Sequence, residues 1–416
     1  MNHPIYFSRP ALLCAAGNNR NELWNSCLNG NQTGIKRTTA LNGKEFLVAK
    51  INDALLTPST GRFDMRIIRI EEKCLSQIED LIFLAKKKFG DERVGVCVGS
   101  CDNGTEFSLA GHKAFFESGA FPTDYSIERQ SADYVATFIS EKYELKGPSL
   151  AFSTACSSSA GAIIKAAQLL DAGMCDAIIA GGIDIASDTV LMGFDSLEAV
   201  SQNITNPFSK NRKGITLGEG AAFFVMTREV LSIMENAAGN ADVPYAPPVA
   251  LLGYGESADA YHLTSPAPDG DGAFRAMNAA LKNACLKPSD IDYINLHGTG
   301  TKFNDSMEAK AVSKIFGEYA IPCSSTKPLV GHTLGAAAAL ECAICIEAIV
   351  NNFKSDKIRL PVHMWDGERD EEMANLNFVG KDSSVLSKKV AVCLSNSFAF
   401  GGANACLIVG AMQNKL

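Results

Sequence analysis

Residues 149–173 read SLAFSTACSSSAGAIIKAAQLLDAG, and this stretch decides the fold class. The apolar run at 149–154 predicts a buried strand, and the Ala-rich run at 157–172 predicts a helix that Gly173 ends. Similar apolar runs alternate with helical stretches along the chain, at 94–99, 177–181, 293–296 and 390–394. Such alternation predicts an α/β protein with buried strands.

A second stretch has the same pattern as the first. Residues 322–325 predict a strand, 326–331 a loop and 335–350 another Ala-rich helix. Each half then ends in a strand that meets a glycine pair, at 181–182 and at 401–402. Gly, Asn, Asp and Pro cluster at 237–248, which is typical of a seam. We therefore predict two halves, 1–245 and 246–416, although Ala-rich helices also resemble one another by chance.

Composition limits the possible partners and location. The chain has a formal net charge of -8 and a pI near 5.4, and 46% of its residues are hydrophobic. This predicts a soluble globular protein and argues against nucleic acid, because binding a phosphate backbone needs a basic surface. The chain start lacks the apolar core of a secretory signal, and no apolar stretch reaches spanning length. We therefore expect a cytoplasmic protein with no membrane partner.

The 13 cysteines predict core residues rather than disulfides. They lack paired spacing, and many lie inside apolar runs, where a thiol packs as a small hydrophobe. Cys342 and Cys345 form a CxxC pair, but within a predicted buried helix and without a second pair. No zinc site is expected there.

Cys156 has a different setting from the other cysteines. It follows a predicted buried strand and precedes three serines at the predicted start of a helix. Free N–H groups and the positive end of the helix dipole favour a thiolate there, so we expect a lowered pKa and an activated nucleophile. On this feature alone, a buried structural cysteine remains the alternative.

Two histidines lie at matching junctions between a strand and a helix. His297 lies in the glycine-containing loop 295–301, and His332 ends the segment 325–332, which also contains Lys327. Such loops at strand ends are where open α/β sheets bind ligands. A turn histidine with a structural hydrogen bond, or a helix cap, is the alternative for each.

A third segment, 396–404, places two aromatic residues beside a glycine pair. Because glycine permits close backbone approach and positive φ, an amide there could face a reacting carbonyl. The alternative is a tight turn between two strands of a hairpin.

Together these motifs resemble the β-ketoacyl-acyl-carrier-protein synthases of the thiolase superfamily, of the elongating type with a Cys-His-His site. The resemblance covers nearly the whole chain and includes NPF at 206–208, GEG at 218–220 and DAYHLTSP at 259–266. It implies an α/β, thiolase-like fold of two similar halves in a layered α-β-α-β-α structure. It also implies an acyltransferase that joins an acyl thioester to malonyl thioester, and a dimer with itself or with a ketosynthase-like subunit.

The resemblance implies a role for each matching residue. Cys156 would accept the acyl group, and His297 and His332 would bind the malonyl thioester carbonyl during decarboxylation. Lys327, with Glu341, would orient this pair, and the N–H groups of Cys156 and Phe400 would form the oxyanion hole. Phe400 would also gate the acyl pocket. Thr299 and Thr301 would bind the phosphopantetheine arm, and Phe398 and Phe107 would contact the acyl chain. No metal or other cofactor is implied, because the substrates are carried on the phosphopantetheine of an acyl carrier protein.

Two basic clusters could dock an acidic carrier protein. They are Arg62, Arg66 and Arg69 in one segment and Lys210, Arg212 and Lys213 in another. Solvated surface charge is the alternative for both.

Several departures from the family pattern bear on the substrate. Ala399 stands where many relatives have glycine, residues 302–304 replace a smaller segment, and 101–107 is less glycine-rich than usual. The resemblance implies fatty acid synthesis or a specialised pathway, and these departures favour a specialised lipid, polyene or polyketide pathway. The alternatives are a non-catalytic partner subunit of the chain-length-factor kind, a thiolase acting on coenzyme A esters, and an acylhydrolase. The presence of Cys156 and of paired histidines favours the decarboxylating enzyme.

Overall fold

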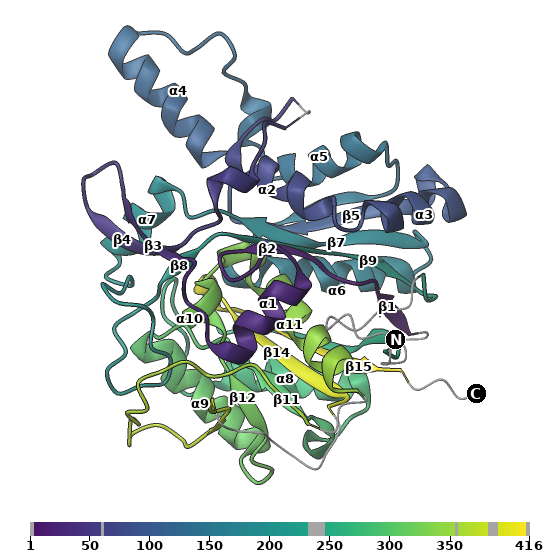
Figure 1. Cartoon of the computed structure of the whole chain (residues 1–416), viewed down its shortest axis with the longest axis vertical. Coiled ribbons are helices and arrows are strands. Elements are labelled where there is room, and N and C mark those ends of the chain that lie inside the picture. The colour runs from purple at the N-terminus through teal and green to yellow at the C-terminus, as the bar shows by residue number, and fades with distance from the viewer. Residues whose placement is uncertain (1–3, 60–61, 232–245, 354–356, 382–389, 413–416) are drawn as a thin grey trace.

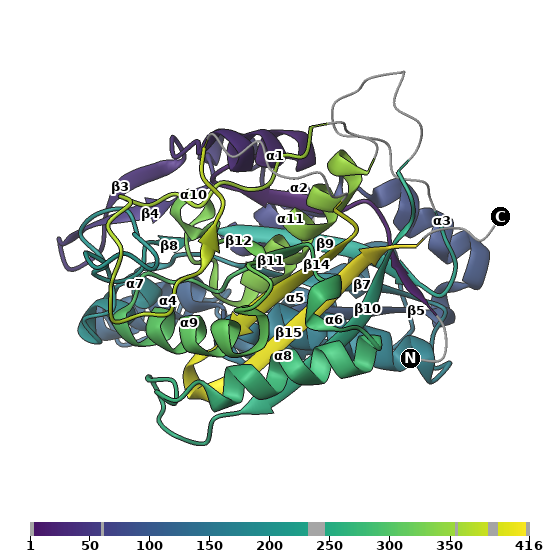
Figure 2. The ribbon, with the colours of Figure 1, turned by 90° about the horizontal axis from the view of Figure 1, so that it is seen from below.

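The chain folds into stacked layers of helix and sheet (Figure 1). The computed structural model describes residues 4–59, 62–231, 246–353, 357–381 and 390–412. Helices α2, α3 and α5 cover one outer face, α6 and α11 pack together in the middle, and α8 and α9 cover the other outer face. Figure 2, from below, shows α8 and α9 in front of strands β10, β14 and β15. This confirms the predicted layered α/β fold.

The helices have the following bounds: α1 Arg20–Asn29, α2 Arg66–Leu75, α3 Glu79–Phe89, α4 Thr105–Ser118, α5 Tyr134–Tyr143, α6 Ser158–Asp171, α7 Asp188–Ser196, α8 Asp271–Ala284, α9 Lys302–Phe316, α10 Lys327–Val330 and α11 Ala337–Asn352. The strands are β1 Ile5–Phe7, β2 Ala11–Cys14, β3 Ile35–Thr39, β4 Glu45–Ala49, β5 Val94–Gly99, β6 Ser149–Phe152, β7 Ala177–Asp184, β8 Leu217–Gly218, β9 Gly220–Thr227, β10 Val249–Ala258, β11 Tyr293–Asn295, β12 Pro322–Ser324, β13 Asn377–Phe378, β14 Val392–Phe398 and β15 Ala403–Ala411.

Strand pairing follows the same pattern in the two halves. In the first, β5 is parallel to β6 and β7, and β7 is antiparallel to β9. In the second, β11 is parallel to β12 and β14, and β14 is antiparallel to β15. Strands β1 and β10 join the two sets into one hydrogen-bonded path. The segment 232–245, which holds most of the expected seam and ends at the expected boundary, lies outside the described residues.

The middle helices are buried because they are built from small and apolar residues. Every described residue of the stretch 337–350 in α11 is buried, including Cys342 and Cys345 of the CxxC pair. The segment Leu334–Asn352 is long and apolar enough to cross a membrane, but 94% of its most apolar window is buried inside the protein. It therefore serves as a core helix between the two halves of the sheet.

Four details differ from the sequence-based expectations. The strand before Cys156, β6, is only partly buried, because it lies at one end of the large sheet. The stretch 326–331 is not a plain loop but contains the four-residue helix α10, which begins with Lys327 and Pro328. The pair Gly181–Gly182 lies within β7, where a side chain on Gly181 would collide with the β9 backbone. Phe107 lies near the start of α4, at the base of an arm, where it packs against buried residues of the first half.

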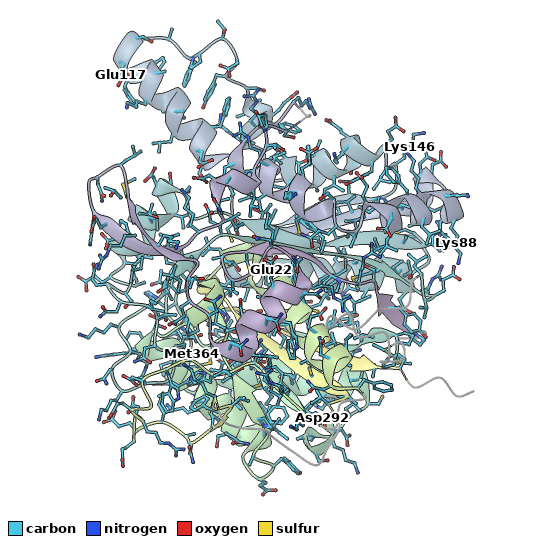
Figure 3. The ribbon with its side chains drawn as sticks, in the orientation of Figure 1. Glu22, Lys88, Glu117, Lys146, Asp292 and Met364 are labelled. Atoms are coloured by element: carbon cyan, nitrogen blue, oxygen red, sulfur yellow. The ribbon has the colours of Figure 1, made fainter. Side chains whose placement is uncertain are left out.

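That arm comprises α4 and the connection to α5, residues 104–133. It extends away from the body, with Glu117 towards its far end (Figures 1 and 3). Its base is fixed by Asp102, which accepts hydrogen bonds from the backbone N–H of Gly104 and from the Tyr134 hydroxyl. The arm thus presents its sides to solvent while both of its ends are held.

Candidate active site

Cys156 lies on a strained turn between β6 and α6. The turn is a short 3-10 segment, Ala155–Ser157, and Ala155 has φ of 49°, which is rare for a residue with a side chain. Only 4% of Cys156 is exposed, yet it lines a cavity of about 530 Å³. The turn therefore aims the thiol into an enclosed space.

The pKa of Cys156 does not follow the sequence-based expectation. Burial is the largest influence and raises the pKa to about 11. The charge of Lys327 and the backbone N–H groups of Phe400 and Cys156 act in the opposite direction but do not outweigh burial. The expected stable thiolate is therefore wrong, and the resting nucleophile is a neutral thiol.

His332 lies next to the thiol. Its Nε2 is 2.9 Å from Sγ of Cys156. The backbone around it is fixed, because His332 N–H donates to Thr216 and its carbonyl accepts from Gly218. Burial and then Lys327 hold the pKa of His332 well below its usual value. The neutral imidazole and the neutral thiol thus form a hydrogen-bonded pair.

His297 faces the same space from β11 and the loop that follows it. Its ring centroid lies 5.4 Å from that of His332, with the planes at 86°. Nζ of Lys327 lies 3.4 Å from Nδ1 of His297 and 2.5 Å from Oε1 of Glu341, and both charged partners are buried. Since an ammonium group can only donate, Nδ1 accepts and the ring proton resides on Nε2. Burial, Lys327 and His332 keep the pKa of His297 well below normal.

The two histidines therefore differ in how far their tautomers are fixed. Nδ1 of His332 has no hydrogen-bond partner among the described residues, so its Nε2 can accept or donate. Nε2 of His297 is restricted to donation.

The protonation of His297 also bears on metal binding, because one ring nitrogen of each histidine and Sγ of Cys156 lie within 4.8 Å of one another. A histidine ligates through an unprotonated nitrogen, so the proton on His297 makes the trio a poor fit for zinc.

Two buried acids on α9 hold the His297 loop, and neither was expected from the sequence. Glu308 accepts from the N–H groups of His297 and Gly298, at 2.8 and 2.7 Å. Asp305 accepts from Gly300 N–H at 3.2 Å. Burial raises the pKa of Glu308 to about 7 despite these hydrogen bonds. Acidic residues three apart on the helix directly after a glycine loop were the signal that could have revealed them.

The segment 396–404 is the hairpin turn that its sequence gave as the alternative, and it also forms part of the cavity wall. It forms the turn of the hairpin between β14 and β15, with Gly401 at φ 84° and Gly402 at φ 79°. Phe400, between Ala399 and this glycine pair, lines the cavity, as does Phe398. The Phe400 ring stacks on the ring of Phe194 from α7, with 5.7 Å between the ring centroids. A hairpin turn and a cavity wall are thus the same element.

Other predicted residues lie near or away from this cavity. Thr299 and Thr301 line it, and their hydroxyl oxygens are 3.1 Å apart. Phe107 does not line it and instead stacks on Tyr125 at 5.2 Å beneath the guanidinium group of Arg129.

The predicted docking cations divide into internal and surface groups. Arg66 pairs with the buried Glu219, and Arg212, only 5% exposed, pairs with Asp370. Arg62 pairs with Glu128 and Glu141, Arg69 with Asp64, and Lys210 with Glu368. Lys213 is exposed and lines the cavity. Arg66 and Arg212 thus form internal ion pairs that stabilise the fold, and they are not part of an exposed docking surface.

Comparison with known proteins decides the family. Residues 11–230 match the model of the β-ketoacyl synthase N-terminal domain, and residues 249–358 match that of the C-terminal domain. The chain belongs to the β-ketoacyl synthase family. These enzymes are condensing acyltransferases of thiolase-like fold, as the sequence predicted.

Curated relatives align with this ketosynthase over nearly its whole length. The 3-oxoacyl-[acyl-carrier-protein] synthase 2 of Coxiella burnetii is 33% identical, over 94% of this chain and 95% of that protein. The protein of the same name in Staphylococcus aureus strain N315 is 29% identical, over 98% of each. These matches support synthase activity over the non-catalytic alternative.

Solved structures show the same arrangement. A ketosynthase from Xenorhabdus doucetiae, solved in complex with its chain length factor, is 34% identical with a TM-score of 0.86, over 99% of this chain and 98% of that one. A β-ketoacyl synthase from Burkholderia phymatum STM815 is 27% identical with a TM-score of 0.80, over 99% and 100%.

Proposed function

We propose that this ketosynthase carries an acyl group on Cys156 and condenses it with malonyl-acyl-carrier protein, with release of CO2. The contact of 2.9 Å between Sγ of Cys156 and Nε2 of His332, inside a cavity of about 530 Å³, carries the proposal. It puts a nucleophile and a proton acceptor within hydrogen-bond reach, at a site where a thioester can enter.

In the first half-reaction, the thiol attacks the carbonyl carbon of the acyl thioester. Nε2 of His332 takes the thiol proton as the new S–C bond forms, because burial disfavours a free thiolate. The oxyanion is stabilised by the N–H groups of Cys156 and Phe400, which face the sulfur. Collapse breaks the bond to the carrier sulfur, and His332 returns the proton to that leaving thiolate.

In the second half-reaction, a malonyl thioester occupies the cavity. Loss of CO2 leaves its electron pair as an enolate, whose oxygen accepts a hydrogen bond from Nε2–H of His297. The ammonium of Lys327 adds positive charge behind this ring, and Glu341 keeps that charge compensated. The enolate carbon attacks the acyl-cysteine and expels the Cys156 thiolate, which then takes up one proton per cycle.

Intact-protein mass spectrometry tests this assignment. After incubation with a panel of acyl carrier proteins, the enzyme should gain one acyl mass, and the Cys156→Ala variant should gain none. Addition of malonyl carrier should then remove the acyl mass and yield β-ketoacyl carrier. An acyl mass that persists in Cys156→Ala would refute the assignment of the nucleophile.

The same panel addresses the pathway. We propose a specialised lipid, polyene or polyketide substrate, supported by the departures at Ala399 and in the segment 101–107, where the polar, buried Asp102 lies. Preferential loading of unsaturated or aromatic acyl chains would support it. Equal elongation of saturated chains would count against it.

We also propose a second ketosynthase-like subunit as partner. Strand β6 lies at the end of the sheet, with no further strand beside it among the described residues. The arm 104–133 exposes Phe116 by 83% and Ile127 by 78%, with Phe115 and Phe121 also exposed, and such a group of apolar side chains on one element is typical of an interaction surface. The Xenorhabdus doucetiae relative was solved with such a partner. Light scattering should show a dimer, alone or with the coexpressed subunit, that Phe116→Asp weakens.

A cytoplasmic location is the remaining part of the proposal. All 13 cysteines, each within the described residues, are free thiols, which suits a reducing compartment. Fractionation of cells that produce the protein should recover it in the soluble cytoplasmic fraction.

A further inference from the structure

Two lysines that form no ion pair among the described residues lie at the cavity that contains Cys156. Lys213 follows the internal Arg212, and Lys302 is the first residue of α9. Both side chains are exposed, and both residues line the cavity. Among the described residues, neither forms an ion pair. By contrast, Lys210 and Arg212 in the same region are paired with Glu368 and Asp370.

The other charges of the cavity wall do not cancel this pair. Arg212 also lines the cavity and pairs with Asp370, whose pKa is lowered mainly by Arg212 and to a smaller extent by the charge of Lys302. Glu198 is the one acidic residue among the described cavity-lining residues, and it lies beside the Lys213 segment, where Ile215 N–H donates to Ala199. In a chain with a net charge of -8, two unpaired ammonium groups against one carboxylate make a locally cationic wall.

The cations also accompany groups suited to a polar, elongated ligand. Thr299 and Thr301 line the same cavity as Lys302 and present hydroxyl groups. Phe303, next to Lys302, is exposed and lines the cavity as well. Polar, apolar and cationic groups thus share one passage that ends at the nucleophile.

We propose that Lys213 and Lys302 form a binding site for the phosphate group of the phosphopantetheine arm. The inference rests on the proposed function and adds to it a determinant of substrate recognition. A phosphodiester carries a permanent negative charge and accepts charge-assisted hydrogen bonds, for which lysine is a suitable point charge. We assign the phosphate rather than acidic side chains of the carrier, because both lysines line the same cavity as Cys156.

The test compares two small acyl donors that differ only in the phosphate. Acyl-phosphopantetheine and acyl-pantetheine are supplied to the wild-type enzyme, and acylation of Cys156 is followed by intact mass. The wild-type enzyme should show kcat/KM roughly tenfold higher for the donor with phosphate, the size expected for one or two solvent-accessible charge-assisted hydrogen bonds. The Lys213→Ala, Lys302→Ala double variant should lose that preference and retain its rate with acyl-pantetheine.

Controls separate the possible outcomes. Lys314→Ala removes a lysine further along α9 that lies over the Phe274 ring, and it should keep the wild-type preference. Equal rates with both donors in the wild-type enzyme would overturn the phosphate site while leaving the proposed function intact. A double variant impaired only with whole acyl carrier protein would overturn it in favour of carrier side chains. Absence of acylation at Cys156 with any donor would instead refute the proposed function.

Discussion

The turn that presents Cys156 and the turn that follows His332 have the same construction and different chemistry. Each opens on a residue with φ of 49°, Ala155 in one and Leu334 in the other. Each forms a 3-10 segment, 155–157 or 334–336, that leads into a buried helix, α6 or α11. The central residue is Cys156 in the first turn and Gly335 in the second.

The difference shows that the turn determines where its central residue lies, whereas the chemistry depends on which side chain that residue carries. The N–H of Gly335 donates to the buried carboxylate of Asp184, and a side chain on Gly335 would come within 2.6 Å of that carboxylate. The second turn thus ties the halves together, while His332, before the turn, supplies the chemistry. At Cys156 the same geometry presents a thiol, and burial rather than the helix end sets its pKa.

The largest expected effect separates the two histidines. His332→Ala should slow acylation of Cys156 by about 10²- to 10⁴-fold, the usual loss for a proton-transferring group. His297→Ala should leave acylation within about threefold, since its loss removes a donor needed only for the enolate, at a cost of about 2.7–4 kcal/mol in condensation. Rapid-quench acylation assays and separate condensation assays measure both. Equal loss of acylation in the two variants would contradict the separate roles assigned to the two histidines.

An intermediate effect is expected at the loop support. Glu308→Ala leaves the N–H groups of His297 and Gly298 and the amide of Asn396 without their acceptor. Stability should fall by about 2–4 kcal/mol, and condensation should fall with it. Glu308→Gln, which retains an acceptor oxygen, should recover much of both, as measured by thermal melting and turnover. If Glu308→Ala melts like the wild-type enzyme, the loop does not depend on this carboxyl group.

The smallest effect concerns the left-handed residues that open the two turns. Ala155→Gly should change stability by less than about 1 kcal/mol, because relief of left-handed strain offsets the flexibility of glycine. Leu334→Gly also removes a buried side chain and should cost about 2 kcal/mol or more. Comparison of the two melting temperatures checks this. A larger loss at Ala155 than at Leu334 would show that the strain has been misjudged.

Most of the fold, and the residues that line the cavity around Cys156, could be predicted from the sequence. Alternating strands and Ala-rich helices predicted the layers, and glycine loops after strands led to His297, His332 and Phe400. These signals are local, since a strand, a small-residue turn and a helix start can be recognised within about ten residues.

What failed depends on the surroundings in three dimensions. The pKa of Cys156 depends on how completely other segments bury it, and the exposure of β6 depends on its place at the end of the sheet. Whether a basic residue is exposed or internally paired depends on acidic residues distant in sequence, as Arg66 and Glu219 show. Charge along a sequence cannot distinguish an internal ion pair from a docking surface.

The pH dependence of Cys156 alkylation tests the central claim, a neutral thiol paired with a neutral imidazole, most directly. In the enzyme without an acyl group, the rate of reaction with iodoacetamide should rise with pH across the alkaline range, with a midpoint near the pKa of about 11. Unfolded enzyme should show the lower midpoint of an ordinary thiol, about 8.5. A folded-state rate that is already maximal at pH 7 would show a stable thiolate and contradict the account.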